Sequence, residues 1–234
     1  MVNYVKRIVC LANSRKHSGR CIAGKAVLDG AYGGWIRPVS ARPSAELSEE
    51  ERRYNSGEDP QVLDIIDVPM LAPAPVLHQS ENHVIDAEYY WTKIGKLPWT
   101  GLRQLIDEPE TLWPNRDSSY YGRNDRIKLE VAGRMTNSLV LICPQGLSIV
   151  VRAEGVEFGN PRRRVRADFR YGGVNYLIAV TDPVAERVFL SGSDGQYPVG
   201  EAYLCISLGE PHTDSCCYKL VASVITERLL RGNE

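Results

Sequence analysis

One short run near the start of the chain collects side chains that can bind phosphate. Between Ser14 and Arg20 the sequence carries two hydroxyl groups and the basic side chains Arg15, Lys16, His17 and Arg20. Arginine and lysine contact phosphate without reading base sequence, and an aromatic ring such as Trp35 or Tyr4 can stack on a base. We therefore predict a nucleic-acid site made of Ser14, Arg15, Lys16, His17, Arg20, Trp35 and Arg37. The alternative is a polar hairpin loop, with Trp35 in the core.

A second basic stretch lies in the later half of the chain. Three consecutive arginines, Arg162 to Arg164, are followed by Arg166 and Arg170. The hairpin described below places Arg164, Arg166 and Arg170 on the outward face of one strand, where they are further candidates for nucleic-acid binding. The alternative is a charged outer sheet face that pairs with acidic side chains of the middle segment.

The spacing from Gly19 to Lys25 matches that of a phosphate-binding P-loop, G-x-x-x-x-G-K. A working P-loop needs Ser or Thr next, and a helix that starts there. Here Ala26 follows and the sequence continues as a strand, so we expect Gly24 to allow close packing or a bulge.

Residues for metal binding or catalysis do not form a complete site. The four histidines are scattered, and His212 with Cys216 and Cys217 lacks the two spaced ligand pairs of a zinc site. Two acidic pairs, Asp64 with Asp67 and Asp86 with Glu88, are weak candidates for holding a divalent ion. We therefore expect no metal and no cofactor, and a binding protein rather than an enzyme.

The clearest local structure is a β-hairpin from 165 to 181. Two apolar runs flank Gly172 and Gly173, and this dipeptide is typical of a two-residue primed turn. The turn sets the register, so that Val165, Ala167, Phe169 and Tyr171 should face the core.

The remaining pattern is mainly β. We expect strands at 4–11, 21–28, 35–39, 62–71, 84–91, 127–131, 139–143, 147–152, 203–208 and 218–225. Residues 13–19 should form a long loop, 43–61 an exposed loop with at most a short helix, 99–107 a helix that starts on Thr100, and Asp182 should cap a short helix that begins at Pro183. This inventory predicts two tandem OB-like β-barrels with short helices, a first domain at 1–124 and a second at 125–234.

Charge is unevenly spread although the net charge is only −1. Residues 1–42 carry +7, residues 43–125 carry −9 and residues 126–234 carry +1. The longest apolar run near the start is too short for a signal peptide or a membrane span, so we expect a cytoplasmic protein. The cysteines show no C-x-x-C pair, and we expect them reduced, with most of them in the core.

Several segments resemble the dual-OB-domain family of bacterial proteins. They are Lys6–Ala12, Ser14–Lys16, Gly19–Gly24 and Gly34–Ser40 at the start, and Ser207–Pro211 and Tyr218–Ala222 at the end. The resemblance implies two OB folds and nucleic-acid binding, often among genes of bacterial conflict and phage-defence systems.

Three functions compete on these grounds. The first is an accessory module that binds single-stranded DNA or RNA. The second is an adaptor that docks a protein partner encoded nearby, and the third is a nuclease or nucleotide-processing enzyme. Salt-dependent binding of oligonucleotides would favour the first.

Overall fold

A computed structural model describes residues 4–232 and divides the chain into two compact units. Unit 1 comprises Met1–Ile106 with Met135–Ser138, and unit 2 comprises Asp107–Arg134 with Leu139–Glu234. The division falls earlier than the expected boundary at 124 because the segment after Ile106 packs on unit 2. Leu112 in that segment is buried in the core of unit 2, and its backbone N–H donates to the Tyr176 hydroxyl at 3.1 Å.

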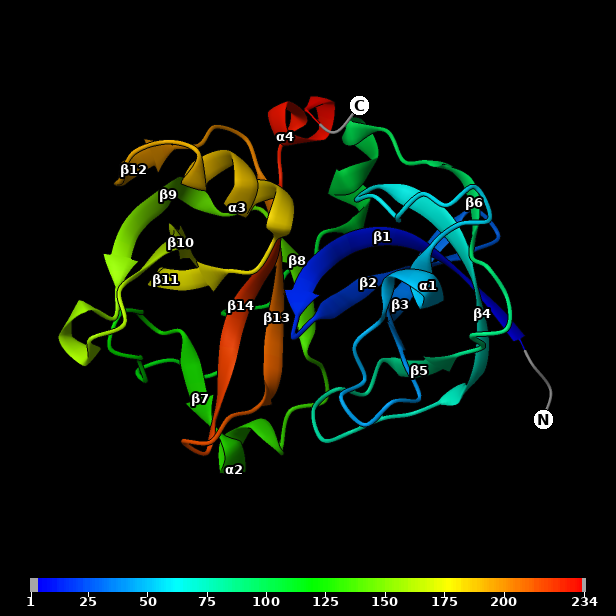
Figure 1. The fold of residues 1–234 in the computed structure, drawn as a ribbon, viewed down its shortest axis with the longest axis horizontal. Coiled ribbons are helices and arrows are strands. Elements are labelled where there is room, and N and C mark those ends of the chain that lie inside the picture. Colours follow the sequence, from blue (N-terminus) through cyan, green and yellow to red (C-terminus); the bar gives the residue numbers. More distant parts are fainter. Residues whose placement is uncertain (1–3, 233–234) are drawn as a thin grey trace. The chain divides into compact units, whose positions relative to one another are not determined.

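Unit 1 is a β-barrel with short helices. Its elements are β1 (Tyr4–Lys16), β2 (Gly19–Leu28), β3 (Ala31–Val39), α1 (Glu49–Arg52), β4 (Asp64–Pro73), β5 (Asn82–Ile85), β6 (Thr92–Lys96) and the 3₁₀ helix η1 (Trp99–Leu105). The strand order is β1-β2-β3-β5-β4, and β4 pairs with β1 to close the barrel, while β3 and β5 run parallel (Figure 1). The apolar side chains of these strands, such as Ile8, Ile22 and Ile66, fill the interior.

One long strand, β1, pairs with two neighbouring strands. Its first part pairs with β4 and its later part with β2, and the register shifts between Cys10 and Ala12. Gly24 of β2 lies opposite Cys10, where an added Cβ atom would stand only 2.1 Å from the carbonyl oxygen of Val9. The prediction of close packing at Gly24 is confirmed, and β2 continues as a strand through the residues that spacing alone assigned to a P-loop.

Three local predictions in unit 1 were wrong. The expected loop at 13–19 is mostly strand, because β1 and β2 stay paired up to Lys16 and Gly19. The strand expected at 84–91 ends at Ile85, and the segment at 99–107 is a 3₁₀ helix preceded by Pro98 rather than capped by Thr100. The loop at 43–61 carries the short helix α1, as expected, with a capping box of Ser48 and Glu51.

Unit 2 repeats the strand order of unit 1. Its elements are β7 (Arg126–Lys128), α2 (Leu129–Ala132), β8 (Leu139–Ile142), β9 (Gln145–Glu154), η2 (Val156–Phe158), β10 (Arg162–Tyr171), β11 (Val174–Val180), α3 (Pro183–Leu190), β12 (Gly195–Pro198), β13 (Tyr203–Pro211), β14 (Cys216–Ile225) and α4 (Glu227–Arg231). The sheet runs β9-β10-β11-β14-β13-β8, and β11 and β14 are parallel. Only Cys143 and Pro144 separate β8 from β9, so these two strands act as one bent first strand that pairs with both β10 and β13, and β12 adds to the free edge of β9.

The hairpin predicted at 165–181 is confirmed. Gly172 and Gly173 form its turn with φ values of 54° and 75°, and Phe169 lies opposite Tyr176 as the register requires. Val165, Ala167 and Phe169 are buried in the core of unit 2, and Tyr171 packs against it.

Two other predictions in unit 2 had different outcomes. Asp182 caps α3 as expected, since its carboxylate accepts from the backbone N–H groups of Val184 and Ala185. The strand expected at 127–131 is wrong beyond Lys128, where the chain turns into α2.

The cysteines form no disulfide within the described part of the chain. Cys10, Cys205, Cys216 and Cys217 are buried, whereas Cys143 is exposed at the break in the first strand of unit 2 and is not the core residue that the sequence suggested. Among residues 4–232 no helix has the length and apolar character needed to span a bilayer.

Candidate nucleic-acid interface

The first predicted site is the tip of the β1–β2 hairpin. Arg15 pairs with Arg20 and Lys16 with Gly19, which leaves a turn of His17 and Ser18 in place of a long loop. The polar strand residues before the turn are satisfied locally: the Asn13 amide donates to the Pro60 carbonyl at 2.8 Å, and the buried Ser14 hydroxyl donates to Cys21 at 3.4 Å. Ser14 is therefore a structural residue.

The remaining side chains of the tip differ in their access to solvent. Arg15 and His17 are exposed, while Lys16 and Arg20 are half-buried. The backbone of Arg20 exchanges two hydrogen bonds with Leu47, and the adjacent Glu46 carboxylate has a lowered pKa, chiefly because Ser44 donates a hydrogen bond to it and with a smaller contribution from His17. An acidic side chain thus lies beside the basic tip and weakens its positive potential.

Trp35 and Arg37 on β3 both contact other side chains of unit 1. Trp35 is half-buried opposite Lys25, whose ammonium group stands 5.6 Å from the centre of the indole ring. Arg37 is 3% exposed and lies 3.1 Å from Glu81. Its guanidinium also donates to the Ser138 hydroxyl at 2.8 Å, so Arg37 is buried and hydrogen-bonded within unit 1.

The second predicted site, on β10, also contains both exposed and buried side chains. Arg164 and Arg170 are exposed, whereas Arg166 between them is 8% exposed. The Arg166 guanidinium donates to both carboxylate oxygens of Glu154, at 2.6 and 3.0 Å, and lies 3.5 Å from Asp125. The outward orientation expected for Arg166 is correct, but another segment of the chain covers it.

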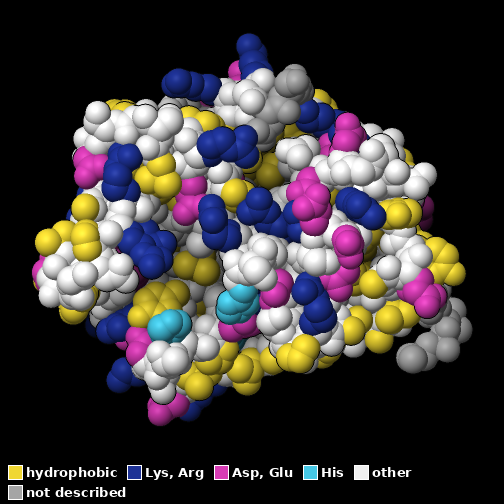
Figure 2. All heavy atoms as spheres, in the orientation of Figure 1, with side chains coloured by type: hydrophobic (Ala, Val, Ile, Leu, Met, Phe, Trp, Pro, Cys, Tyr) yellow, Lys and Arg dark blue, Asp and Glu magenta, His cyan; other side chains and the backbone are white. Residues whose placement is uncertain are grey.

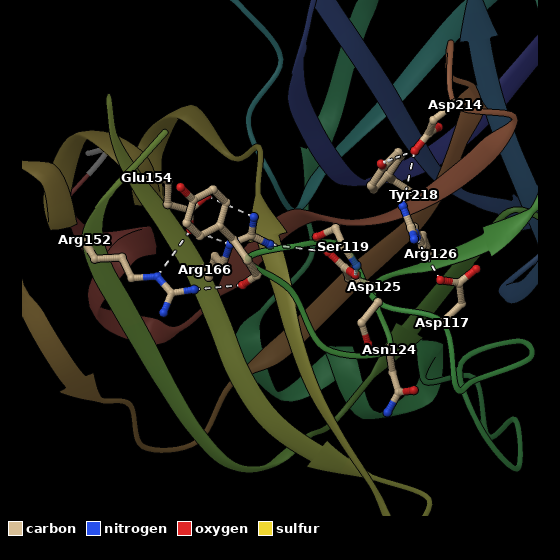
Figure 3. Close-up of polar contacts among 12 residues, drawn as sticks. Asp117, Ser119, Asn124, Asp125, Arg126, Arg152, Glu154, Arg166, Asp214 and Tyr218 are labelled. Atoms are coloured by element: carbon tan, nitrogen blue, oxygen red, sulfur yellow. Dashed lines mark hydrogen bonds and ion pairs between the residues drawn. The ribbon is translucent and has the colours of Figure 1, made fainter. Parts of the chain in front are cut away.

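That covering segment is 115–126, which we call the strap. It crosses the outer face of β10 and β11, and Figure 3 shows its side chains directed toward Arg166 on one side and Tyr218 on the other. Arg123 exchanges two backbone hydrogen bonds with Leu177 of β11, and the Asp125 carboxylate accepts from the backbone and hydroxyl of Ser119. The strap is thereby joined to the sheet at Arg123 and at Asp125, and is braced internally by Ser119.

Both ends of the strap are tied by charged side chains. Arg126 donates to Asp117 at 2.9 Å and to Asp214 at 3.3 Å, and the Asp117 hydrogen bond is the main reason that the pKa of Arg126 is raised. Lys219 of β14 donates to the Pro114 carbonyl at 2.9 Å and to Asn115 at 3.0 Å. Burial lowers the pKa of Lys219 to about 7, with Asp125 opposing the shift.

Exposed aromatic rings lie where the strap meets the β9–β10 connection. Tyr120 of the strap is 71% exposed and Phe158 of η2 is 69% exposed. Their ring centres are 5.7 Å apart at an interplanar angle of 70°, and Tyr121 stands edge-on to Tyr120 at 4.8 Å. We call Tyr120, Tyr121 and Phe158 the aromatic group.

Two arginines flank the aromatic group. Arg152 of β9 lies 5.7 Å from the centre of the Tyr121 ring and donates to the Tyr121 carbonyl at 2.8 Å. Directly opposite Arg152 on the neighbouring strand is Arg164. Arg164 makes no ion pair with any described residue, and Figure 2 shows basic side chains grouped on this side of unit 2 with hydrophobic ones beside them.

Comparison with known protein families identifies the fold. Residues 6–224 match the family of dual OB-containing domains. The chain belongs to that family. The prediction of two OB-like barrels is confirmed, and the repeated strand order explains how one family description covers both units. No curated protein matches the sequence.

In this dual OB protein the carboxylates of Asp64 and Asp67, one of the two acidic pairs considered for metal binding, are engaged by other groups. Asp64 is buried, accepts a hydrogen bond from the Tyr54 hydroxyl at 2.8 Å and lies 2.7 Å from Lys93. Asp67 is paired with Arg7 at 2.7 Å. Over the described residues no three His, Cys, Asp or Glu side chains gather in a way that could hold a metal ion.

Sequence reasoning missed the aromatic group. Tyr120 and Tyr121 stand between polar residues, with Arg116 and Arg123 close by in the sequence, and this mixture of aromatic and basic residues was a usable signal. Phe158 follows a strand by only four residues and gave no sign of its exposure.

Proposed function

We propose that the chain binds single-stranded DNA or RNA, with its main phosphate contacts at the β9–β10 end of unit 2. The observation that carries this proposal is the pair of Arg152 and Arg164, which lie directly opposite each other on adjacent strands, with Glu154 offsetting part of the charge of Arg152 at 3.4 Å. Like charges in that position destabilise a sheet. A phosphate group between or above them removes the repulsion and gains charge-assisted hydrogen bonds.

Further positive charge lies along the same face. Arg162 is two residues from Arg164 on β10, so its side chain points to the same side of the sheet, and it is exposed. Arg162 forms no ion pair within the part of the chain that the structure describes. Two exposed arginines at this spacing, together with Arg152, give a short basic row in which Glu154 lies opposite Arg162.

The fold supports the same choice of ligand. OB barrels bind oligonucleotides across their second and third strands and by the loops beside them. In unit 2 these strands are β10 and β11, whose outer face the strap covers. The loop between β9 and β10 stays accessible, so we place the ligand at this end of the hairpin rather than across the sheet face.

The test is the salt dependence of oligonucleotide binding. Fluorescence anisotropy would measure the affinity for 12-nucleotide DNA and RNA strands between 50 and 300 mM salt, for the wild type and for Arg162→Gln/Arg164→Gln. Each phosphate contact contributes a log–log slope of about 0.7 for single strands, so the double variant should lower the slope by about 1.4. The matched control is Arg134→Gln/Arg228→Gln, which removes the same charge from exposed positions after α2 and in α4.

The hairpin tip of unit 1 supplies a second arm of the same experiment. Neutralising Arg15, Lys16 and Arg20 together should lower the slope by about 2 if all three contact phosphate. We expect a smaller change, because two of these side chains are half-buried and Glu46 lies beside them. Equal slopes for the β10 variant and its control would contradict the proposed site.

A protein adaptor is the second candidate function. It is favoured by the adjacent rings of Tyr89 and Tyr90 in unit 1, which are 58% and 49% exposed. Stable co-purification with a neighbour-encoded protein, lost in Tyr89→Ala/Tyr90→Ala, together with no affinity for oligonucleotides, would place this function first. A role in bacterial conflict or phage defence stays a prediction that the neighbouring genes can test.

A further inference from the structure

We propose that Tyr120 and Phe158 form a stacking site for the bases of the bound strand. This inference rests on the proposed function and adds to it the part of the ligand that the rings contact. The two rings come from different segments, the strap and η2, and meet edge to face with 5.7 Å between their centres. An edge-to-face pair leaves ring faces open, and each side chain is more than two-thirds exposed.

Both rings stand on rigid supports. The short helix η2 is bounded by Gly155 and Gly159, which have φ values of 86° and 69° and so fix the direction in which the chain enters and leaves the turn. An added Cβ atom at Gly155 would stand 2.5 Å from the carbonyl oxygen of Asn160, so the turn is closed tightly. The backbone that carries Phe158 is therefore held in a tight turn, and its ring packs edge to face on Tyr120.

Tyr121 joins the two supports. Its hydroxyl accepts from the backbone N–H of Gly155 at 2.6 Å and donates to the Glu157 carboxylate. The hydrogen bond to Glu157 is the largest reason that the pKa of Tyr121 is raised. Because these bonds tie the strap to the β9–β10 connection, the Tyr120 and Phe158 rings keep their separation before any ligand arrives, which reduces the ordering cost of binding.

The chemistry around the rings indicates a nucleic-acid strand as the occupant. Large exposed rings next to one another usually mark an interaction site. Here Arg152 contacts the neighbouring Tyr121 ring and faces Arg164, so arginine side chains lie beside the rings. The carboxylates of Glu154 and Glu157 lie there too, the first paired with Arg152 and the second bonded to Tyr121. A strand whose phosphates meet the arginines can place its bases on the rings, and the bases must be unpaired, since in a duplex their faces are already stacked.

The experiment removes the rings and compares three probes. Tyr120→Ala, Phe158→Ala and the double variant would be measured with a 12-nucleotide thymidine strand, the same length of abasic strand, and a duplex. Base stacking on an aromatic ring supports a loss of about tenfold or more in affinity per ring for the thymidine strand. Binding of the abasic strand should change less than twofold, and the salt slope should stay at the wild-type value because no charge is removed.

Two controls keep the result specific. Tyr120→Phe retains the ring and should keep the wild-type affinity, while Tyr89→Ala removes a ring of similar exposure from unit 1 and should have no effect. Thermal unfolding of each variant checks that the fold is kept.

The outcomes separate the two proposals. If the ring variants bind the thymidine strand like the wild type while Arg162→Gln/Arg164→Gln lowers the slope, the stacking site is wrong and the proposed function stands. Equal losses for the thymidine and abasic strands would show that the rings only support the arginines, which also overturns stacking. If the wild type binds none of the three probes at 50 mM salt, both proposals fail.

Discussion

The two barrels share one strand order but bend their first strand by different means. In unit 1, β1 is continuous and bends at a bulge between Cys10 and Ala12, against which Gly24 packs closely. In unit 2 the equivalent strand is broken at Cys143 and Pro144 into β8 and β9. A proline removes a backbone donor and so ends sheet pairing, whereas a bulge keeps the strand paired on both sides. The same topology therefore tolerates two unrelated solutions at its most curved strand.

The units also differ in what covers their second and third strands. Unit 2 carries the strap across β10 and β11, tied at each end by Arg126 and Lys219. In unit 1 the equivalent strands are β2 and β3, and the short segment at 135–138 reaches Arg37. Each cover buries an arginine that the sequence alone made a candidate for ligand binding. A basic residue on the second or third strand of such a barrel therefore indicates a binding site only where no other segment of the chain covers it.

The buried arginines give the largest expected effects. Arg166→Leu removes the closest cation from Glu154 and Asp125 and leaves Glu154 only the longer contact with Arg152, and we expect a loss of about 3 kcal/mol or more in the free energy of unfolding. Arg37→Leu should cost less, because it strands a single carboxylate, Glu81, which keeps the hydrogen bond from Ser138. Urea unfolding would measure how much unfolding free energy each variant loses. A larger loss for Arg37→Leu than for Arg166→Leu would contradict our comparison of the two units.

Intermediate effects are expected at the two bends. Gly24→Ala should destabilise by about 1–3 kcal/mol, since its Cβ atom would overlap the Val9 carbonyl. Gly146, just after the break in unit 2, has space for a Cβ atom but a φ of 61°, so Gly146→Ala should cost about 1 kcal/mol through backbone strain. Asparagine tolerates that backbone region, so Gly146→Asn should recover much of the loss while Gly24→Asn should not. Chemical denaturation of the four variants would show whether the bends differ in mechanism.

The effect expected at the anchor of the strap is small near neutral pH and grows as the pH rises. The pKa of Lys219 is about 7 in the folded chain, while an unperturbed lysine in the unfolded chain has a pKa near 10.4. Between these values the unfolded chain binds more protons, so the contribution of Lys219 to stability should rise with pH, by about 1 kcal/mol per unit above pH 7. Below pH 7 both states are protonated and the contribution should level off.

The comparison of wild type with Lys219→Met isolates this group from other titrations. The difference in unfolding free energy between the two proteins should be flat from pH 5.5 to 6.5 and should slope from pH 7.5 to 9. A difference that does not change over the upper range would mean that Lys219 keeps its charge in the folded chain.

Sequence patterns predicted the elements whose signals are local. The hairpin at Gly172 and Gly173, the cap at Asp182 and the close packing at Gly24 depend on neighbouring residues and were all found. The polar strand ends near Ser14 were read as loop because the carbonyl that satisfies Asn13 belongs to Pro60, far along the chain. Burial of Arg37 and Arg166 and exposure of Phe158 follow from tertiary contacts with segments that carry no matching pattern, so the candidate site could be predicted only in part.

The tie between Lys219 and Asn115 also has a consequence for synthesis on the ribosome. The two residues are 104 positions apart, and the strap leaves the ribosome before any strand of the sheet on which it lies. Until β14 has been translated, the start of the strap lacks its contacts with Lys219. The hydrogen bond from Arg37 likewise cannot form until Ser138, 101 residues later, has been translated. A pause in translation before residue 138 would therefore leave the first barrel without the hydrogen bond from Arg37 to Ser138, and a pause before residue 219 would leave the strap without its Lys219 contacts.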